Sequence, residues 1–217
     1  MNITVFPSPL SGSVRAIGSK SDIHRLLICA AFADSVTEIR GFFGSEDVYA
    51  TIRCIKAIGA DAVISDDICT VTPVTCRRRG PYLDCGESGS TFRFMLPVAC
   101  AVCGSAEFTG RGRLPDRPVK DLISALRSGG ISFSGEKLPF RTHGKLTAGT
   151  YYIPGNISSQ YVSGLLIALS LLEGKSELIL TSAPESSGYI DMTVSTLSRF
   201  GAEISCSGMR YTIPEAD

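Results

Sequence analysis

Three stretches of this chain share one design, a turn rich in glycine and serine that leads directly into an apolar run. A serine before an apolar run caps the free backbone N–H groups at a helix start, so the pattern predicts three helices that begin alike. The turns are Gly18-Ser19-Lys20-Ser21, Gly86-Glu87-Ser88-Gly89-Ser90 and Gly155-Asn156-Ile157-Ser158-Ser159-Gln160, and the apolar runs are residues 26–32, 92–102 and 161–172.

These three helix starts predict a binding site for an anionic substrate. The N-terminal end of a helix attracts anions because its aligned backbone dipoles leave partial positive charge there. Lys20, Arg25 and Arg93 add full positive charges at two of the starts. One such start would be ordinary capping, but three with attached cations indicate a pocket for a substrate with several negative charges.

The stretches also mark a repeat of roughly seventy residues, which occurs three times and which we read as β-α-β-α-β-β. The opening helices are apolar nearly all round, which indicates burial on every side. We therefore predict an α/β fold in which three near-parallel buried helices are surrounded by sheets, an inside-out α/β barrel. The copies cover about residues 14–82, 83–154 and 155–217.

Each copy should contain a second, amphipathic helix, at residues 47–59, 117–129 and 189–201. Each of these helices is expected to end at a glycine in the left-handed conformation. Pro97 lies inside the second opening helix and should kink it or delay its regular start.

Composition excludes several classes of function. The 217 residues carry 21 Lys+Arg and 21 Asp+Glu, so no overall field favours a nucleic acid or a membrane. Most of the eight cysteines lie in apolar segments, and Cys100 and Cys103 have no second Cys/His pair at zinc-ligand spacing, which favours a structural role in a reducing compartment. We expect no metal, no cofactor and no serine-hydrolase triad, and a cytoplasmic protein because no signal peptide is recognisable.

Individual residues at the helix starts suit the binding of a phosphorylated, sugar-like ligand. Lys20 can pair with a phosphate or a carboxylate, and Arg25 can aim a planar guanidinium at an anion. For Arg93 two roles stay open, an anion ligand or a brace that donates to backbone carbonyls. Ser158, Ser159 and Gln160 offer short hydrogen-bonding groups, and Arg117 lies in the most basic loop of the chain.

At these residues the chain resembles the enolpyruvyl transferases, in the branch of the 5-enolpyruvylshikimate-3-phosphate synthases. Five motifs in the family's order carry the resemblance, which runs from about Val14 to the C-terminus. They are Gly18-Ser19-Lys20-Ser21-x-x-x-Arg25, Gly86-Glu87-Ser88-Gly89-Ser90-Thr91-x-Arg93, Arg117-Pro118, Ser158-Ser159-Gln160 and Ser186-Ser187-Gly188-Tyr189-Ile190-Asp191-Met192-Thr193.

The resemblance implies a transferase of the shikimate pathway, in aromatic amino acid biosynthesis, and the target of glyphosate. Such enzymes transfer the enolpyruvyl group of phosphoenolpyruvate to the 5-hydroxyl of shikimate 3-phosphate and release phosphate. By carry-over, the residues that bind shikimate 3-phosphate are Lys20, Ser21, Arg25, Ser158, Ser159, Gln160, Ser186 and Tyr189. Those that bind phosphoenolpyruvate are Lys20, Gly89, Arg117 and Gln160, and Arg93 supports them. Lys20 touches both substrates and is the expected catalytic residue.

The chain departs from the family in sequence and in length. Many members have Asn where this chain has Glu87 and His24, and Gly188 replaces a common Pro. Family enzymes have two lobes of three copies each, and this chain has three copies, so residues 14–217 correspond to the lobe that binds shikimate 3-phosphate. Residues 1–13 are expected to form a strand that belongs with the second lobe. That C-terminal lobe is the expected partner and would supply the acid/base carboxylates, in a monomeric enzyme of which this chain alone is inactive.

Two alternative functions stay open. The first is a lobe of a UDP-N-acetylglucosamine enolpyruvyl transferase, against which Ser21 and the cysteine-free segment 111–118 argue. That family usually has Asn after the first-motif lysine and a cysteine in the arginine loop. The second alternative is a non-catalytic anion-binding module. An exposed apolar face where a second lobe would dock favours the lobe over the module.

Overall fold

The computed structural model describes residues 3–9, 11–14, 16–76 and 78–215. Three serine-capped helices form its centre, α1 (Lys20–Ala31), α3 (Gly89–Val102) and α5 (Ser159–Leu169). The hydroxyls of Ser19, Ser88 and Ser158 accept hydrogen bonds from backbone N–H groups of the first turn, at 3.3, 3.1 and 3.3 Å. These caps confirm the helix starts that the three turns predict.

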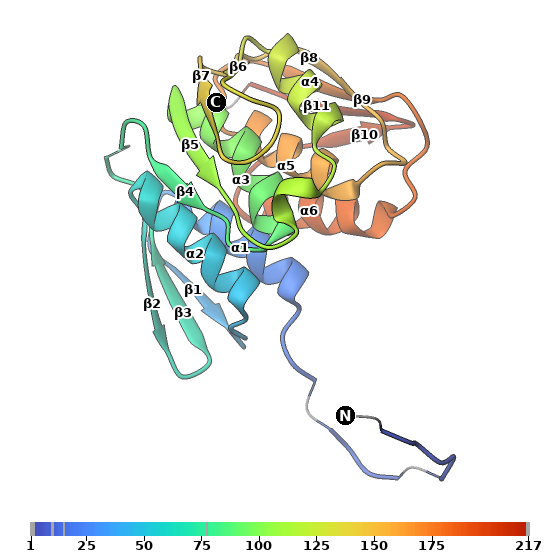
Figure 1. Ribbon diagram of the computed structural model, residues 1–217. Coiled ribbons are helices and arrows are strands. Elements are labelled where there is room, and N and C mark those ends of the chain that lie inside the picture. Colours follow the sequence, from blue (N-terminus) through green and yellow to red (C-terminus); the bar gives the residue numbers. More distant parts are fainter. Residues whose placement is uncertain (1–2, 10, 15, 77, 216–217) are drawn as a thin grey trace.

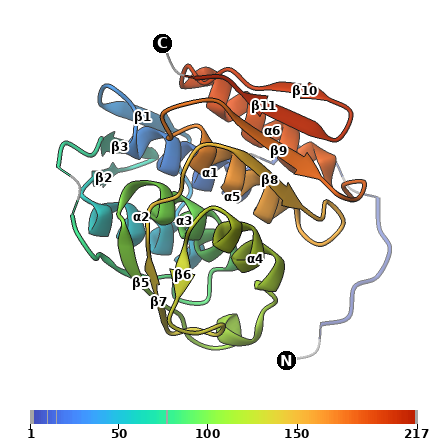
Figure 2. The same ribbon diagram turned by 90° about the horizontal axis from the view of Figure 1, so that it is seen from above.

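Three sheets surround the central helices, as Figure 2 shows. In the second and third sheets, the strand that begins each copy lies at one edge of the sheet. It pairs in parallel with the next strand of the same copy, and all other strand pairs in the described residues are antiparallel. The first sheet has the order β1-β3-β2, from β1 (Thr37–Arg40), β2 (Asp61–Ser65) and β3 (Ile68–Thr72). The second has the order β4-β5-β7-β6, from β4 (Tyr82–Asp84), β5 (Ser105–Thr109), β6 (Ser132–Phe133) and β7 (Phe140–His143). The third has the order β10-β11-β9-β8, from β8 (Thr150–Ile153), β9 (Ser176–Leu180), β10 (Ser205–Ser207) and β11 (Arg210–Ile213).

The order of elements along the chain is that of the expected repeat (Figure 1). The second copy runs β4-α3-β5-α4-β6-β7 and the third runs β8-α5-β9-α6-β10-β11. The first copy runs α1-β1-α2-β2-β3, without a first strand in the residues that the structure describes. Both β4 and β8 lie in the segments just before their motifs.

The second helices of the copies are α2 (Glu46–Ile58), α4 (Lys120–Ser128) and α6 (Ser187–Arg199). The expected start of α4 at Arg117 is wrong, because Pro118 disfavours helical conformation at the residue before it. Arg117 is instead extended, with φ −72° and ψ 138°, after a short 3-10 turn at Leu114–Asp116. The left-handed glycine expected at 129 is also wrong; Gly130, with φ 92°, takes that conformation.

Helices α3 and α5 pack closely because Pro97 lacks a backbone N–H and Gly164 lacks a side chain. Pro97 has no N–H, so it leaves the carbonyl oxygen of Arg93 without its intrahelical donor. That oxygen lies against Gly164 of α5, where an added Cβ would also stand 3.0 Å from Cγ of Pro97. Helix α3 runs through Pro97 from Gly89 to Val102, so the proline does not delay its start.

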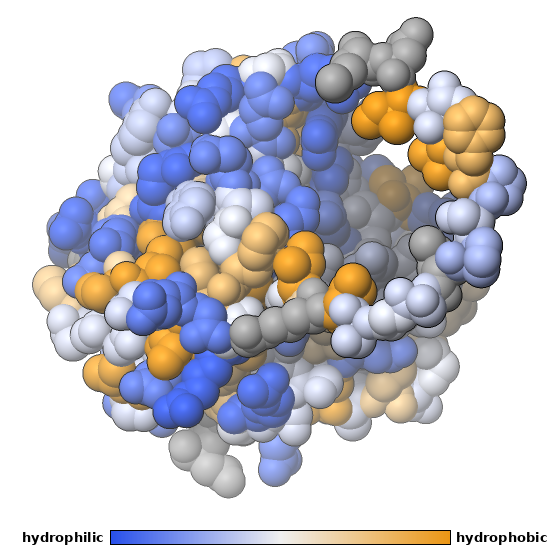
Figure 3. All heavy atoms as spheres, turned by 90° about the horizontal axis from the view of Figure 1, so that it is seen from below, coloured by the Kyte–Doolittle hydropathy of each residue, from blue (hydrophilic) through white to orange (hydrophobic). Residues whose placement is uncertain are grey.

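Residues 3–9 and 11–14, near the N-terminus, stand clear of the body of the molecule (Figures 1 and 3). Residues 3–9 and 11–14 have no helix or strand and are exposed, including Ile3, Val5 and Phe6 at 79–84%. Residues 1, 2 and 10 of the expected strand segment lie outside the described residues. Among the described residues, the structure contains no helix with the length and hydropathy needed to span a membrane.

Candidate functional site

Lys20 and Asp47 form an ion pair between the first turns of α1 and α2. The ammonium Nζ of Lys20 lies 2.7 Å from Oδ2 of Asp47, and the Lys20 side chain is 48% exposed. Ser45 caps α2 by accepting from the backbone N–H of Val48 at 3.4 Å. Sequence reasoning missed Asp47, because an acidic residue in the first turn of a helix is the ordinary complement of its dipole.

A buried chain of hydroxyls ties the same helix ends to α3. Oγ1 of Thr91 lies 3.0 Å from the backbone carbonyl oxygen of Asp47, 2.8 Å from Oγ of Ser88 and 2.7 Å from Oγ1 of Thr51. Oγ1 of Thr51 lies 2.7 Å from Nδ1 of His24. Burial lowers the pKa of His24 to about 4, so the imidazole that ends this chain is neutral at pH 7.

Gln160 connects α5 to α3 through both ends of its amide. Its Nε2 donates to Oγ of Ser90 at 2.8 Å, and its Oε1 accepts from Nη1 of Arg93 at 2.7 Å. Arg93 also donates from Nη2 to the carbonyl oxygen of Pro118 at 3.4 Å. Arg93 thus makes bracing contacts that hold Gln160 and the arginine loop together, and its role toward an anion stays a prediction.

Gly89 lies beneath two guanidinium groups at the N-terminal end of α3. A Cβ at this position would stand 2.5 Å from Nη1 of Arg117 and 3.2 Å from Nη1 of Arg93. Both cations therefore lie over a helix start, where the dipole adds to their attraction for an anion. Glu87, in the same loop, is exposed, and its carboxylate lies against Gly112 of the arginine loop.

Arg25 is buried one turn inside α1 and is 2% exposed. Burial lowers the pKa of its guanidinium to about 10. Four of its five donors have partners in the described part of the chain. Nε donates to Oγ1 of Thr193 at 2.6 Å, and Nη1 donates to the carbonyl oxygen of Ser21 at 2.7 Å. Nη2 donates to Oγ of Ser163 at 3.1 Å and to the carbonyl oxygen of Tyr189 at 3.0 Å. Arg25 thus joins α1 to α5 and α6.

The remaining expected site residues lie at the starts of α1, α5 and α6. Ser21 and Ser159 are partly buried in the first turns of α1 and α5. Ser158 uses its hydroxyl as the cap of α5. Ser186 is exposed at the start of α6 and makes no side-chain cap, and the side chain of Tyr189 is 48% exposed.

Direct bonds join the five motifs in two groups. The second motif bonds to the third and the fourth through Arg93 and Gln160, and the first bonds to the fifth through Arg25 and Tyr189. Sequence reasoning missed the groups that hold these residues, namely Asp47, Ser90, Ser163 and Thr193. Ser163 is a small hydroxyl inside α5, where the sequence alone gives no functional signal, whereas Thr193 ends the fifth motif and could have been found there.

Comparisons with known proteins agree with this architecture. The family model described as EPSP synthase (3-phosphoshikimate 1-carboxyvinyltransferase) matches residues 6–214. A 3-phosphoshikimate 1-carboxyvinyltransferase of Clostridium botulinum (strain Eklund 17B / Type B) is 40% identical over 208 residues, which are 92% of this chain and 48% of that protein. The protein of the same name from Clostridioides difficile (strain 630) is 36% identical, over 94% of this chain and 49% of its own length.

A solved structure gives the same fold. An EPSP synthase of Acinetobacter baumannii superposes with a TM-score of 0.80 at 23% identity, over 95% of this chain and 47% of that chain. The α/β fold expected from the sequence is thereby confirmed. This chain spans about half the length of the curated relatives that it matches. The chain belongs to the EPSP synthase (3-phosphoshikimate 1-carboxyvinyltransferase) family.

Proposed function

We propose that this chain is the lobe that binds shikimate 3-phosphate in a two-lobe enzyme. That enzyme transfers the enolpyruvyl group of phosphoenolpyruvate to the 5-hydroxyl of shikimate 3-phosphate and releases phosphate. One observation carries the proposal: hydrogen bonds and an ion pair link the capped starts of α1, α3 and α5. The links are Lys20–Asp47–Thr91 on one side and Ser90–Gln160 on the other. We call the surface formed by these three helix starts the mouth. Both substrates are polyanions, which suits three converging helix dipoles.

The two substrates divide the mouth between them in this proposal. Phosphoenolpyruvate lies over Gly89 and is bound by Arg117, Gln160 and Lys20, with Arg93 holding Gln160 in place. Shikimate 3-phosphate lies over the starts of α1, α5 and α6. The groups that bind it are Lys20, Ser21, Arg25, Ser158, Ser159, Gln160, Ser186 and Tyr189.

Lys20 is the group that touches both substrates. Its ammonium has three donors and is half exposed, so it can turn from Asp47 to two anions at once. Addition to the enolpyruvyl group builds charge, and fixed cations at helix starts stabilise such charge without reorganisation. Half of these contacts belong to the other lobe, so we expect negligible turnover from this chain alone.

The cellular setting is part of the proposal. The complete enzyme is proposed to work as a cytoplasmic monomer. Cys29, Cys54, Cys69, Cys85 and Cys100 are buried thiols, and burial raises the pKa of Cys29 and Cys100 to about 12. Buried thiols of this kind are typical of proteins from a reducing compartment.

A calorimetric titration with shikimate 3-phosphate at modest salt tests the proposal. Saturable binding is expected, with a loss of at least roughly tenfold in Lys20→Ala, because a hydrogen bond to a charged group contributes about 1.5–3 kcal/mol. Lys145→Ala is the matched control, since its neighbour Leu146 donates to Cys100 near the far end of α3. No binding at millimolar ligand, or equal affinity in both variants, contradicts the proposal.

A non-catalytic anion-binding module is the second candidate, because the two guanidinium groups over the start of α3 at Gly89 could bind a simple anion without a second lobe. It predicts that the chain binds simple anions such as inorganic phosphate as tightly as shikimate 3-phosphate. Competition between the two ligands in the same titration separates the candidates, because a lobe of the enzyme must recognise the ring hydroxyls as well as the phosphate.

A further inference from the structure

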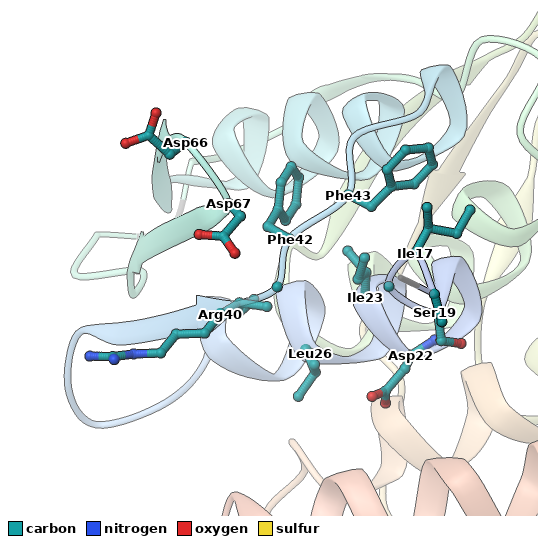
Figure 4. Close-up of a pocket in the computed structure, with 14 residues that line it drawn as sticks. Ile17, Ser19, Asp22, Ile23, Leu26, Arg40, Phe42, Phe43, Asp66 and Asp67 are labelled. Carbon is teal, nitrogen blue, oxygen red and sulfur yellow. The ribbon is translucent and has the colours of Figure 1, made fainter. Parts of the chain in front are cut away.

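His24 lies on a face of α1 that is closed to solvent. The side chains of Ile23 and Leu26, on the neighbouring face, line a hollow of about 690 Å³ beside β1 (Figure 4). His24 instead contacts α2 through Nδ1, which lies 2.7 Å from Oγ1 of Thr51, and its side chain is fully buried. None of the proposed ligand contacts involves this ring. Its role therefore has to come from the residues that it contacts inside the protein.

The hydroxyl of Thr91 donates its proton away from Thr51. Oγ1 of Thr91 lies 3.0 Å from the backbone carbonyl oxygen of Asp47, which can only accept a hydrogen bond. Thr91 is also the donor to Oγ of Ser88, at 2.8 Å. A hydroxyl has a single proton, so Thr91 shares it between these two acceptors and has none for Thr51.

Thr51 and His24 must then supply the protons of the next two contacts. Oγ1 of Thr51 lies 2.7 Å from Oγ1 of Thr91 and donates to it. That donation uses the single proton of Thr51, so the contact between Thr51 and His24 needs a proton on Nδ1. A neutral imidazole has one N–H, and burial keeps the ring neutral by lowering its pKa to about 4. Nδ1 therefore carries the proton, and Nε2 is an acceptor without one.

The other ring nitrogen of His24 has no partner. Among the buried side-chain nitrogens and oxygens of the described residues, Nε2 of His24 is the one for which the structure shows no hydrogen bond. A buried acceptor without a donor is unfavourable. An apolar side chain of similar size would fill the same space without leaving such an acceptor. The N–H at Nδ1 is thus what this position gains from a histidine.

The row of hydrogen bonds that begins at His24 ends at the helix start that holds Lys20. Thr91 receives a proton from Thr51 and donates its own to the backbone carbonyl of Asp47. The carboxylate of Asp47 lies 2.7 Å from Nζ of Lys20. Buried hydrogen bonds that all run in one direction polarise and strengthen one another. A donor at His24 therefore helps to fix the first turn of α2 against α3.

We propose that His24 is a positioning residue for Lys20. Its Nδ1–H starts a one-way row of hydrogen bonds, through Thr51 and Thr91, that fixes the first turn of α2. Asp47, on that turn, holds Lys20 at the mouth. This inference rests on the proposed function, in which Lys20 touches both substrates, and it adds a residue that touches neither of them.

Nitrogen NMR on the free chain, with isotope-labelled histidine, measures which ring nitrogen carries the proton. The chain has two histidines, and the exposed His143 gives the reference signals of a ring in water. The expected result is a protonated Nδ1 and a bare Nε2 in His24, at neutral pH. A proton on Nε2 overturns the proposal, because the row of hydrogen bonds would then lack its first donor.

Three variants test whether this donor positions Lys20. His24→Leu removes the donor, and Thr51→Val removes the next hydroxyl with little change of shape, should the first variant fail to fold. The side-chain order parameter of Lys20 is expected to fall by at least roughly a third in both. His24→Asn should restore it, because its Nδ2 donates from as many bonds away from the backbone as Nδ1 of the histidine.

Lys56 is the matched control for these measurements. It lies in the last turn of α2 and pairs with Asp61 at 2.8 Å, so its order parameter should stay that of the parent chain. Joint loosening of Lys20 and Lys56 would show a general weakening of α2 and overturn the proposal. An unchanged Lys20 in both donor-free variants, or an Asn variant that behaves like the Leu variant, would do the same.

Titration with shikimate 3-phosphate connects the positioning to the ligand. The donor-free variants are expected to lose roughly threefold or more in affinity, and His24→Asn to stay within about twofold of the parent chain. Equal affinities in all of these chains would overturn the role toward the ligand. Absence of binding in the parent chain contradicts the proposed function instead, and the NMR measurements still decide what His24 does, so the two failures are distinguishable.

Discussion

The ammonium of Lys20 lies 2.7 Å from the carboxylate of Asp47, across the starts of two helices from one copy of the repeat. Their side chains are 48% and 32% exposed, so solvent screens the pair. A pair of this kind contributes about 0.2–1 kcal/mol to stability. Asp47 therefore holds Lys20 at the mouth, but lightly enough that an anionic ligand can displace it.

Asp47→Asn should leave stability almost unchanged and strengthen anion binding. The free energy of unfolding is expected to change by less than about 1 kcal/mol, and the affinity for inorganic phosphate to rise roughly two- to fivefold, since Lys20 no longer has to leave a carboxylate. Urea denaturation and calorimetry measure the two quantities. A weaker affinity would show that Asp47 positions Lys20 for the ligand.

Gly164→Ala should be destabilising, because the new methyl group meets the Arg93 carbonyl and Pro97 where α3 and α5 touch. We expect a loss of about 1–3 kcal/mol from overpacking, read from urea denaturation. Gly188→Ala is the matched control, since a Cβ there meets nothing within 4 Å in the first turn of α6. Equal effects of the two substitutions would refute the close approach of the helices.

Gly89→Ala should weaken phosphoenolpyruvate binding with little change in stability. The methyl group would stand 2.5 Å from Nη1 of Arg117, and the exposed arginine can move away at small cost. The cation then leaves the helix start, so a several-fold loss of affinity for phosphoenolpyruvate is expected by calorimetry. Unchanged affinity would mean that the ligand does not lie over Gly89.

His24 should make stability depend on pH. Burial lowers its pKa from 6.5 to about 4, so between these values the unfolded chain binds a proton that the native chain does not. The free energy of unfolding therefore falls as the pH falls from 6.5 to 4, by about 3 kcal/mol in all. His24→Asn should remove this part of the pH dependence in urea denaturation. His143→Asn, at an exposed position, should retain it, and identical profiles for all three chains would contradict the assignment.

Arg25→Lys should cost about 2–4 kcal/mol of stability, because a lysine cannot reach the four partners that the guanidinium holds in fixed directions. Arg127→Lys is the control, since that arginine pairs with Glu136 at the surface and should lose less than about 1 kcal/mol. Ligand binding by Arg25→Lys must be measured well below the melting temperature of the variant, so that a loss of affinity is not caused by unfolding. A stability unchanged by Arg25→Lys would show that the buried bonds contribute little.

Local signals predicted most of the fold. Ser19, Ser88 and Ser158 each precede an apolar run, and each caps a helix as expected. The errors came from tertiary and neighbour effects on backbone conformation, as where Pro118 moves the start of α4 from Arg117 to Lys120. The absence of a first strand in the described residues of the first copy has no local signal, because the segment before Gly18 differs little from the strands of the other copies.

Candidate site residues inside the sequence motifs could be expected from the sequence. The long-range contacts that hold them in place could not. Lys20 and Gln160 were expected from their places at helix starts, and Arg117 from its place in the most basic loop of the chain. Nothing in the sequence shows that Arg25 will be enclosed by Thr193, which is 168 positions away, or that Asp47 will face Lys20. Contacts between residues so far apart in the sequence depend on how the three copies pack together. Local sequence patterns do not show that packing.

The bond from Arg25 to Thr193 has a consequence for synthesis of the protein. It joins the first copy to the third, so the guanidinium cannot be both buried and satisfied until residue 193 has left the ribosome. Until then α1 must stay partly solvated, because an unpaired buried cation is strongly unfavourable. The nascent chain therefore completes its centre late, and the interval before that is when its three apolar helices are most exposed to aggregation and most in need of chaperones.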